Sequence, residues 1–111
     1  MEITTKQYKR CDLVTVKGRI DSATAPQLSD AFDVITNGGR YKIAVDLGGL
    51  DYMSSAGLRA LLAVQKLCKR YNHGEVVLAA VPVRIHEAMD LAGFLPLFKT
   101  FDDGTAAVGY F

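Results

Sequence analysis

Two adjacent serines, Ser54 and Ser55, are the residues best placed to carry chemistry. They stand before Ala56 and Gly57, where a predicted strand gives way to a predicted helix. A serine at the start of a helix can cap its free N–H groups, which stabilises the helix by about 1 kcal/mol. One cap needs one hydroxyl, so two adjacent serines exceed what a cap requires, and a nucleophile has to be considered.

A serine hydrolase also carries its nucleophile at a strand-to-helix turn, but its elbow has a glycine two residues before the serine. Met53 occupies that position before Ser55, and only Gly57, two residues after it, matches the pattern. The two histidines, His73 and His86, form no cluster with a second group that would orient a base. We therefore expect no catalytic residue, and a serine hydrolase is the remotest of the alternatives.

A second polar loop runs from Gly18 to Thr24 (GRIDSAT), between the second predicted strand and the first predicted helix. Ser22 or Thr24 is expected to cap that helix. In open α/β sheets, sites form where strands end at their carboxyl ends and helices begin. The loop and the serine pair are therefore expected to form one surface.

The remaining motifs favour no metal, redox or nucleotide site. Cys11 and Cys68 stand alone without C-x-x-C spacing, so we expect two reduced, buried thiols. Neither of the common phosphate-binding glycine motifs occurs, and Gly38-Gly39 and Gly48-Gly49 are interpreted as turns. No metal and no cofactor are expected.

Charge and hydropathy narrow the class of partner. The chain has 13 Lys and Arg against 12 Asp and Glu, a formal net charge of +1, and like charges do not cluster along it. This balance gives no support for a nucleic-acid partner. The apolar runs are far shorter than the ~20 residues that span a bilayer, and the N-terminus is polar. We expect a cytoplasmic protein without membrane insertion, monomeric alone, whose partner is a protein or a small ligand.

Short strands and helices alternate along the chain and must position the two loops. Strands are predicted at 3–8, 11–17, 42–47, 75–81 and 98–101, with Gly18 ending the second and residues 48–53 forming a turn. Helices are predicted from Pro26 to Asn37, from Leu58 to Tyr71 and from Pro82 to Ala92, and 102–107 begins a truncated fourth. The stop signals are Asn37 to Gly39, Asn72 to Gly74, and Gly93.

The helices show apolar residues at three- and four-residue steps, which indicates the faces turned to the core. This alternation predicts one α/β domain over residues 1–111, with a mixed, mostly parallel sheet of four to five strands. An N-terminal antiparallel hairpin and three to four helices complete it. The predicted core-facing residues are Leu28, Ala31, Phe32 and Ile35, then Leu58, Leu61, Leu62, Cys68 and Tyr71, and finally Ile85, Ala88, Met89 and Ala92.

Three segments together resemble the STAS domain of bacterial anti-sigma factor antagonists, and the likeness extends over nearly the whole chain. They are SSAGLRALL at 54–62 after the strand KIAVDL, GRID at 18–21, and AGFLPLF at 92–98. The part of the chain after Asp103 is shorter than the final helix of many members. The resemblance implies a STAS-like fold.

The resemblance also implies a switch. Ser55 aligns with the serine that a partner kinase phosphorylates, and Ser54 stands where the family usually has Asp. An unphosphorylated antagonist binds an anti-sigma factor, itself a serine kinase, and frees a sigma factor; phosphorylation reverses this, and a serine phosphatase restores binding. The implied partner-binding residues are Asp21, Ser22, Thr24, Ser54, Ala56, Gly57, Leu58 and Arg59.

A STAS domain can also act as a non-switching adaptor. Examples are the small STAS subunit of a lipid-transport ABC system and a scaffold component of a stress-sensing complex. Phosphorylation at Ser55 by a cognate kinase separates the antagonist from the adaptor and from the hydrolase.

Overall fold

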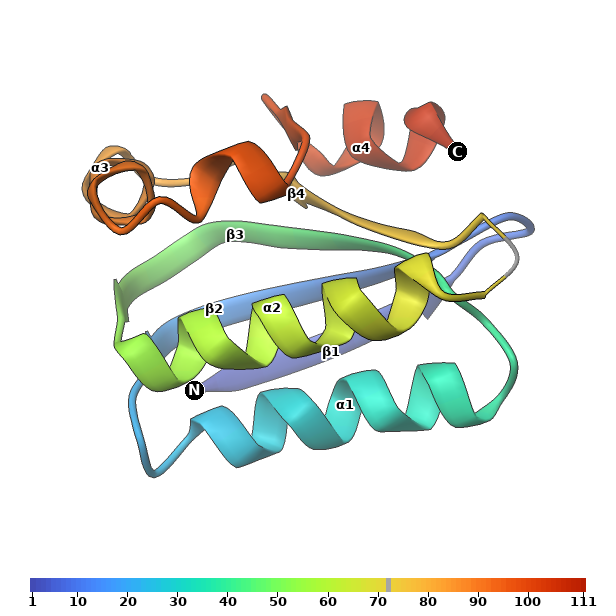
Figure 1. Ribbon diagram of the computed structural model, residues 1–111, viewed down its shortest axis with the longest axis horizontal. Coiled ribbons are helices and arrows are strands. Elements are labelled where there is room, and N and C mark those ends of the chain that lie inside the picture. The colour runs from blue at the N-terminus through green and yellow to red at the C-terminus, as the bar shows by residue number, and fades with distance from the viewer. Residues whose placement is uncertain (72) are drawn as a thin grey trace.

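Within residues 1–71 and 73–111, which the computed structural model describes, five strands form one mixed sheet (Figure 1). Their order across the sheet follows their order along the chain. The first pair is antiparallel and the others are parallel, so the predicted mixed sheet with an N-terminal hairpin is confirmed. The strands are β1 (Glu2–Gln7), β2 (Asp12–Ile20), β3 (Lys42–Met53), β4 (Glu75–Ala79) and β5 (Thr100–Phe101).

Helices cover both faces of this sheet. Helices α1 (Ala25–Asn37) and α2 (Ser55–Lys69) lie side by side on one face, and α4 (Gly104–Tyr110) lies on the other (Figure 1). Helix α3 (Val83–Leu91) and the 3-10 helix η1 (Leu95–Leu97) follow β4. The predicted fourth helix is confirmed, and its N-cap Asp103 accepts a hydrogen bond from the N–H of Ala106 at 2.8 Å. Asn72, predicted to help end the second helix, lies outside the described residues.

Strand β4 explains why the sheet needs helices on both faces. Val76 and Leu78 belong to the large core under α1 and α2, while Val77 and Ala79 belong to a smaller core under α4. The prediction of a strand covered on both faces is therefore confirmed. The strand ends at Ala79, two residues earlier than predicted, because Ala80 has a positive φ of 53° and leaves the strand.

Strand β2 does not end at Gly18, as the sequence predicted, but continues to Ile20. Gly18 has a φ of +93°, which favours glycine, and the pairing of β2 with β3 shifts register between Gly18 and Arg19. The glycine thus allows a bulge inside the strand. The extension places the polar loop after Ile20, beside the carboxyl end of the neighbouring strand β3.

Strand β3 likewise continues through residues 48–53, which were wrongly predicted to form a turn. Gly49 pairs with Lys17, and a Cβ at Gly49 would lie only 2.7 Å from the Lys17 Cγ. The glycine therefore serves close packing between strands rather than a change of direction. Gly38-Gly39 does form the predicted turn, with the Gly38 N–H donating to the Ile35 carbonyl at 3.1 Å.

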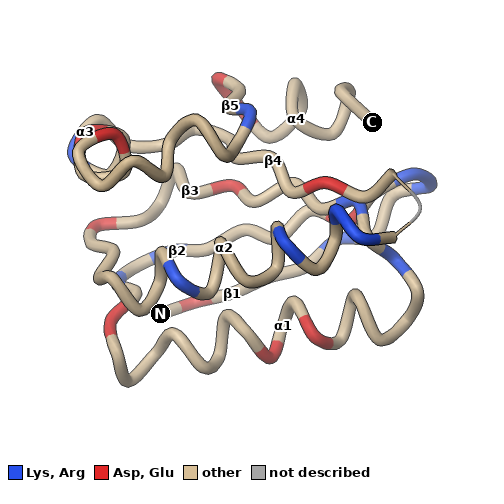
Figure 2. The backbone as a smooth tube through the Cα atoms, in the orientation of Figure 1, with Lys and Arg blue, Asp and Glu red and all other residues tan. Residues whose placement is uncertain are grey.

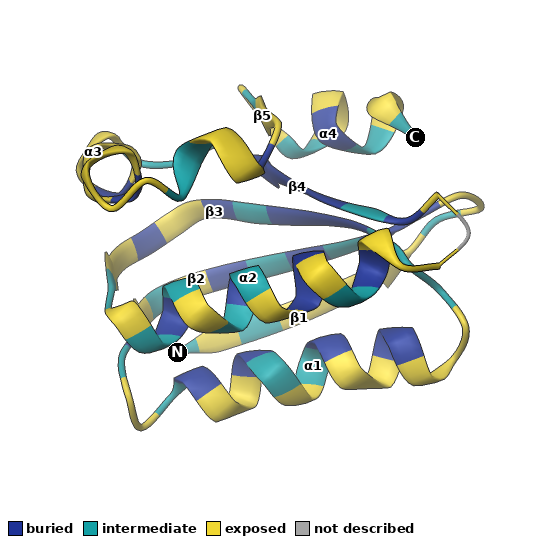
Figure 3. Ribbon diagram, in the orientation of Figure 1, coloured by how far each residue is buried: buried dark blue, intermediate teal, exposed yellow. Residues whose placement is uncertain are grey.

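The other differences from the predictions concern the ends of helices and strands and the residues expected in the core; Figure 3 shows the burial along the chain. Tyr71 lies beyond the end of α2, is exposed, and stacks on Tyr41 with ring centroids 4.7 Å apart. Helix α3 buries Ile85 and Met89 only, so the core positions predicted for Ala88 and Ala92 are wrong. The first strand begins one residue early, and η1 leaves only a two-residue last strand.

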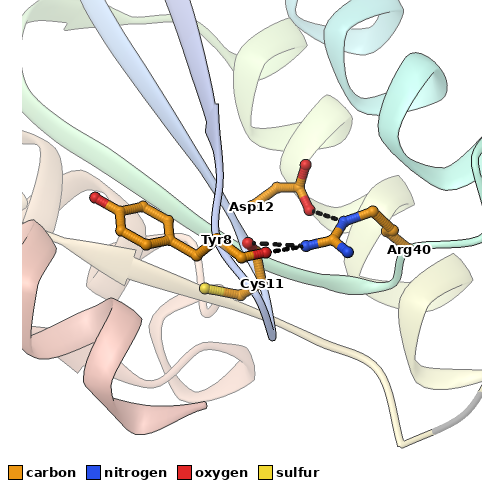
Figure 4. Close-up of polar contacts among 4 residues, drawn as sticks. All are labelled: Tyr8, Cys11, Asp12 and Arg40. Atoms are coloured by element: carbon orange, nitrogen blue, oxygen red, sulfur yellow. Dashed lines mark hydrogen bonds and ion pairs between the residues drawn. The ribbon is translucent and has the colours of Figure 1, made fainter.

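A partly buried ion pair fixes the end of the molecule where the β1–β2 turn lies (Figure 4). Arg40 pairs with Asp12, whose residue surface is only 6% exposed. Its Nη2 also donates to the carbonyl oxygens of Tyr8, at 2.5 Å, and Cys11, at 3.1 Å. One guanidinium therefore joins the hairpin to the connection between α1 and β3.

Candidate functional site

The two polar loops meet because β2 and β3 are parallel neighbours that end side by side. Ile20 is the register partner of Met53, the last residue of β3. The Ser54 N–H donates to the Ile20 carbonyl at 2.8 Å, which joins the start of the polar loop to the start of α2. The geometry therefore brings the two sequence-predicted segments to one edge of the sheet.

Asp21 organises the loop after β2. Its Oδ1 accepts hydrogen bonds from the N–H groups of Ala23 and Thr24, both at 3.0 Å. The Thr24 hydroxyl accepts from the Asp21 N–H at 2.9 Å and lies 3.1 Å from both Asp21 Oδ1 and the Arg19 carbonyl. Hydrogen bonds from the Thr24 backbone and hydroxyl lower the pKa of Asp21 below its usual value. The carboxylate is thus ionised at neutral pH and engaged within its own loop.

Neither hydroxyl of this loop caps α1 as predicted. Thr24 occupies the N-cap position without a side-chain cap bond, because its hydroxyl turns back into the loop. Ser22 is exposed. The N–H of Ala25 instead donates to the Asp21 carbonyl at 2.8 Å. Ser22 is therefore a surface residue in this edge and takes no part in the loop's hydrogen bonds.

The two serines lie in different environments. Ser54 is the N-cap residue of α2, with an extended backbone, but its side chain makes no cap bond. Its Oγ is buried and has no hydrogen-bond partner among the described residues. Ser55 is the first residue of α2 and is exposed. The hydroxyl that solvent and a partner can reach is therefore that of Ser55.

Gly57 sets how closely α2 approaches the ends of the two strands. It is buried, and a Cβ there would lie 2.7 Å from Ile20 Cγ2 and 2.8 Å from Met53 Cγ. Ala56 and Leu58 are half-buried against the main core. The remaining predicted residue, Arg59, is exposed.

Sequence reasoning missed a feature beside these loops. Arg19 and Tyr52 are register partners on β2 and β3, and the Arg19 guanidinium lies 4.5 Å from the centre of the Tyr52 ring. Tyr52 also lines a groove of about 240 Å³ between the end of β3, the start of α2 and α3. The misassigned turn hid this pair, although the alternation of Leu50, Asp51 and Tyr52 is a strand signal.

The described residues offer little for metal or acid–base chemistry. Among residues 1–71 and 73–111, no three His, Cys, Asp or Glu side chains form a group that could hold a metal ion. Cys11 and Cys68 are buried and unpaired with each other, and burial raises the pKa of Cys68 to about 11. Both histidines are exposed, and within the same residues no hydrogen bond joins either to Ser55. No helix in this part of the chain has the length and apolar content to cross a membrane.

Comparison with known proteins gives a consistent family. The STAS domain family model matches residues 2–107. BtrV of Bordetella bronchiseptica, which carries the name of an anti-sigma factor antagonist, is 32% identical over 111 residues, covering 100% of this chain and 95% of that protein. The anti-sigma-F factor antagonist RsfB of Mycobacterium tuberculosis is 25% identical over 107 residues, covering 96% of this chain and 88% of that protein.

Solved structures agree on the fold. An anti-sigma factor antagonist from Mycobacterium paratuberculosis superposes with a TM-score of 0.87 at 21% identity, covering 98% of this chain and 92% of that chain. The anti-sigma factor antagonist SpoIIAA, in its unphosphorylated form, gives a TM-score of 0.84 at 15% identity, covering 98% of this chain and 95% of that one. Together with the family model, these likenesses show that the chain belongs to the STAS domain family.

Proposed function

We propose that this protein is an anti-sigma factor antagonist whose partner choice is switched at Ser55. In its unphosphorylated form it binds an anti-sigma factor that is also a serine kinase, and so releases a sigma factor. Phosphorylation of Ser55 by that kinase ends the complex, and a serine phosphatase restores it. The names of BtrV and RsfB support the antagonist role.

The observation that carries the proposal is the contrast between the two serines. Ser55 is exposed at the first residue of α2, whereas the Oγ of Ser54 is buried. A kinase must place the acceptor hydroxyl in line with the phosphate of ATP, so it needs a serine that solvent reaches. Ser55 satisfies this requirement without any rearrangement of the helix.

The start of α2 also tolerates the added charge. The first N–H groups of a helix have no partner within the helix, and its dipole favours an anion there by roughly 0.3–1 kcal/mol. Arg59, on the exposed side one turn later, is available for a charge-assisted contact. A phosphate on Ser55 is therefore compatible with the folded domain.

The same phosphate opposes docking. It adds about −1.5 to −2 charge at neutral pH, which must be desolvated or must face the partner when the complex forms. The surface that the partner is proposed to contact comprises the Asp21 loop, the start of α2, and the groove beside Tyr52 and Leu58. Partner affinity falls while the fold persists.

The direct test is phosphate mapping. The protein is incubated with ATP and the serine kinases encoded beside its gene, and the product is analysed by mass spectrometry. Phosphate at Ser55 in the wild type and in Ser54→Ala, with none in Ser55→Ala, is the expected result. Labelling of Ser54 in the Ser55→Ala protein would overturn the assignment, and no labelling would favour a non-switching adaptor.

The partner surface has its own test. Asp21→Ala removes the carboxylate that orders the loop, and Leu58→Ala removes a half-buried apolar side chain at the groove. Each variant should weaken binding to the anti-sigma factor, measured by calorimetry, while Lys6→Ala on the exposed outer strand leaves it unchanged. Equal affinity for all of these proteins would show that the partner binds elsewhere.

A further inference from the structure

The carboxyl ends of β2 and β3, together with the start of α2, are called the Ser55 edge below. A second groove lies on the later half of α2, away from this edge. Its volume is about 490 Å³, larger than that of the groove beside Tyr52. Lys66 is the first charged residue of its lining along α2, and it lies roughly 16 Å along the helix from Ser55. Its lining combines the apolar side chains of Leu62, Pro96 and Leu97, here called its floor, with the cations Lys66, Lys69 and Arg70.

The shape of this groove is fixed by Gln65, a buried polar residue that is 4% exposed. Its Nε2 donates to the carbonyl oxygens of Leu97, at 2.8 Å, and Val76, at 3.0 Å, and its Oε1 accepts from the Val76 N–H at 2.7 Å. One side chain thus holds η1 against α2 and β4. The floor is therefore preformed, and Leu97 remains 44% exposed on it.

The charge around the groove is of one sign. Lys66, Lys69 and Arg70 are all exposed, and none of the described residues that line the groove is a carboxylate. The ion pair found within residues 1–71 and 73–111 is that of Arg40 with Asp12, so these three cations have no ionic partner among those residues. Lys and Arg positions along the backbone of the β1–β2 turn and near the start of β3 lie at the same end of the molecule (Figure 2).

Cations in the last turn of a helix complement its dipole, but this does not account for the exposed apolar floor beside them. Lys66, Lys69 and the C-cap residue Arg70 follow i, i+3, i+4 spacing, so they form one row over the last turn of α2 and its C-cap. Carboxylates at the same spacing on a facing helix would meet that row, and apolar side chains on its inner face would fill the groove.

The geometry points to a second docking surface, the α2–η1 groove, which takes an acidic, amphipathic segment of a partner protein. Charge complementarity selects acidic residues, and the apolar floor requires one or two large aliphatic side chains between them. A nucleic acid is disfavoured because the described lining residues include no aromatic side chain on which a base could stack. This surface acts independently of the switch at Ser55.

The test uses a fluorescein-labelled peptide of about fourteen residues, with Leu at helical i, i+3, i+7 spacing and Glu at most other positions. Its binding to the full protein is followed by fluorescence anisotropy. We expect saturable binding that weakens as salt rises from about 50 to about 200 mM. The double variant Lys66→Glu/Lys69→Glu should weaken it about tenfold or more, and Leu97→Ser several-fold.

A matched control carries the same charge change elsewhere. Lys6→Glu/Lys17→Glu, on the exposed surface of the hairpin, should bind the peptide within about twofold of wild type, as should Ser55→Asp. Thermal melting of each variant confirms folding. Equal weakening by both double variants would show non-specific attraction, and weakening by Ser55→Asp would show that the groove is part of the switch; either result overturns the proposal.

Two further probes decide the class of occupant. A single-stranded oligonucleotide and vesicles containing phosphatidylserine are titrated under the same conditions. The proposal requires that the acidic peptide bind more tightly than both, and that replacing its Glu residues by Gln or its Leu residues by Ser abolish binding. Tighter binding of the oligonucleotide or the vesicles, or no peptide binding at all, would overturn it.

Discussion

At the Ser55 edge, two neighbouring strands end side by side and short loops lead directly into helices, whereas the opposite end gathers cations from separate segments of the chain. Residues in the first region lie close in sequence to the strand ends that place them. In the second, Arg10, Arg40 and Lys42 line one pocket only because the β1–β2 hairpin and the α1–β3 connection both turn there. A site built from residues close to predicted strand ends can be recognised in the sequence, whereas a site built from distant segments cannot.

The two ends also differ in how their polar groups are satisfied. Arg40 makes an ion pair and two backbone hydrogen bonds at one end. At the other end, the Ser54 hydroxyl is buried without a partner among the described residues, and no side chain caps the start of α2. We infer that Arg40 stabilises the fold at the cation end, while the N–H groups at the start of α2 stay available to a partner.

The largest expected effect is at the cation end. Arg40→Ala leaves the buried Asp12 carboxylate without its partner and removes the hydrogen bonds to two carbonyl oxygens. The free energy of unfolding should fall by about 2–4 kcal/mol, measured by urea denaturation. The control Arg10→Ala removes an exposed cation at the same end and should cost less than about 0.5 kcal/mol. Similar losses in both variants would contradict the distinction between Arg40 and the exposed cations near it.

The next effect is at the Ser55 edge. A methyl group at Gly57 would overlap Ile20 and Met53, so Gly57→Ala should lower the free energy of unfolding by about 1–3 kcal/mol. Gly109→Ala provides the matched control, because Gly109 lies in α4 with open space around its Cα. The control should be neutral or slightly stabilising. A stabilised Gly57→Ala protein would show that α2 is not held closely against the strand ends.

These two cases show what the sequence could and could not predict. The hairpin, the helices and the buried β4 follow from local periodicity, and the serine pair and the GRID loop are short motifs at predicted boundaries. Gly18 was wrongly predicted to end a strand, and Gly48-Gly49 to form a turn. The sequence alone does not distinguish a bulge or a close contact between strands from a turn. Gln65 and the groove that it shapes depend on contacts with Val76 and Leu97, distant in the chain.

A smaller effect is expected from pH at the Asp21 loop. Because folding lowers the pKa of Asp21, its contribution to stability is present above the ordinary value near 3.8 and is lost as pH falls through the lowered pKa. The amide signals of Ala23 and Thr24 should therefore shift with pH below that value in NMR spectra. Asp21→Asn should remove this transition; amide shifts that persist in the variant would assign it to another group.

The smallest effect is expected at Ser54. A serine that caps a helix costs about 1 kcal/mol when replaced by alanine. The Ser54 hydroxyl makes no cap bond and has no partner among the described residues, so Ser54→Ala should change the free energy of unfolding by less than about 0.5 kcal/mol or increase it. Chemical denaturation distinguishes the two cases. A loss near the capping value would show that the hydroxyl is bonded in solution.

The central claim is that phosphate on Ser55 changes partner binding while leaving the fold intact. The most direct measurement titrates the anti-sigma factor with unmodified and Ser55-phosphorylated protein by calorimetry, and compares their thermal melting. We predict an equal or slightly higher Tm for the phosphorylated protein, and an affinity lower by about tenfold or more. Equal affinities, or a phosphorylated protein that has unfolded, would contradict the account.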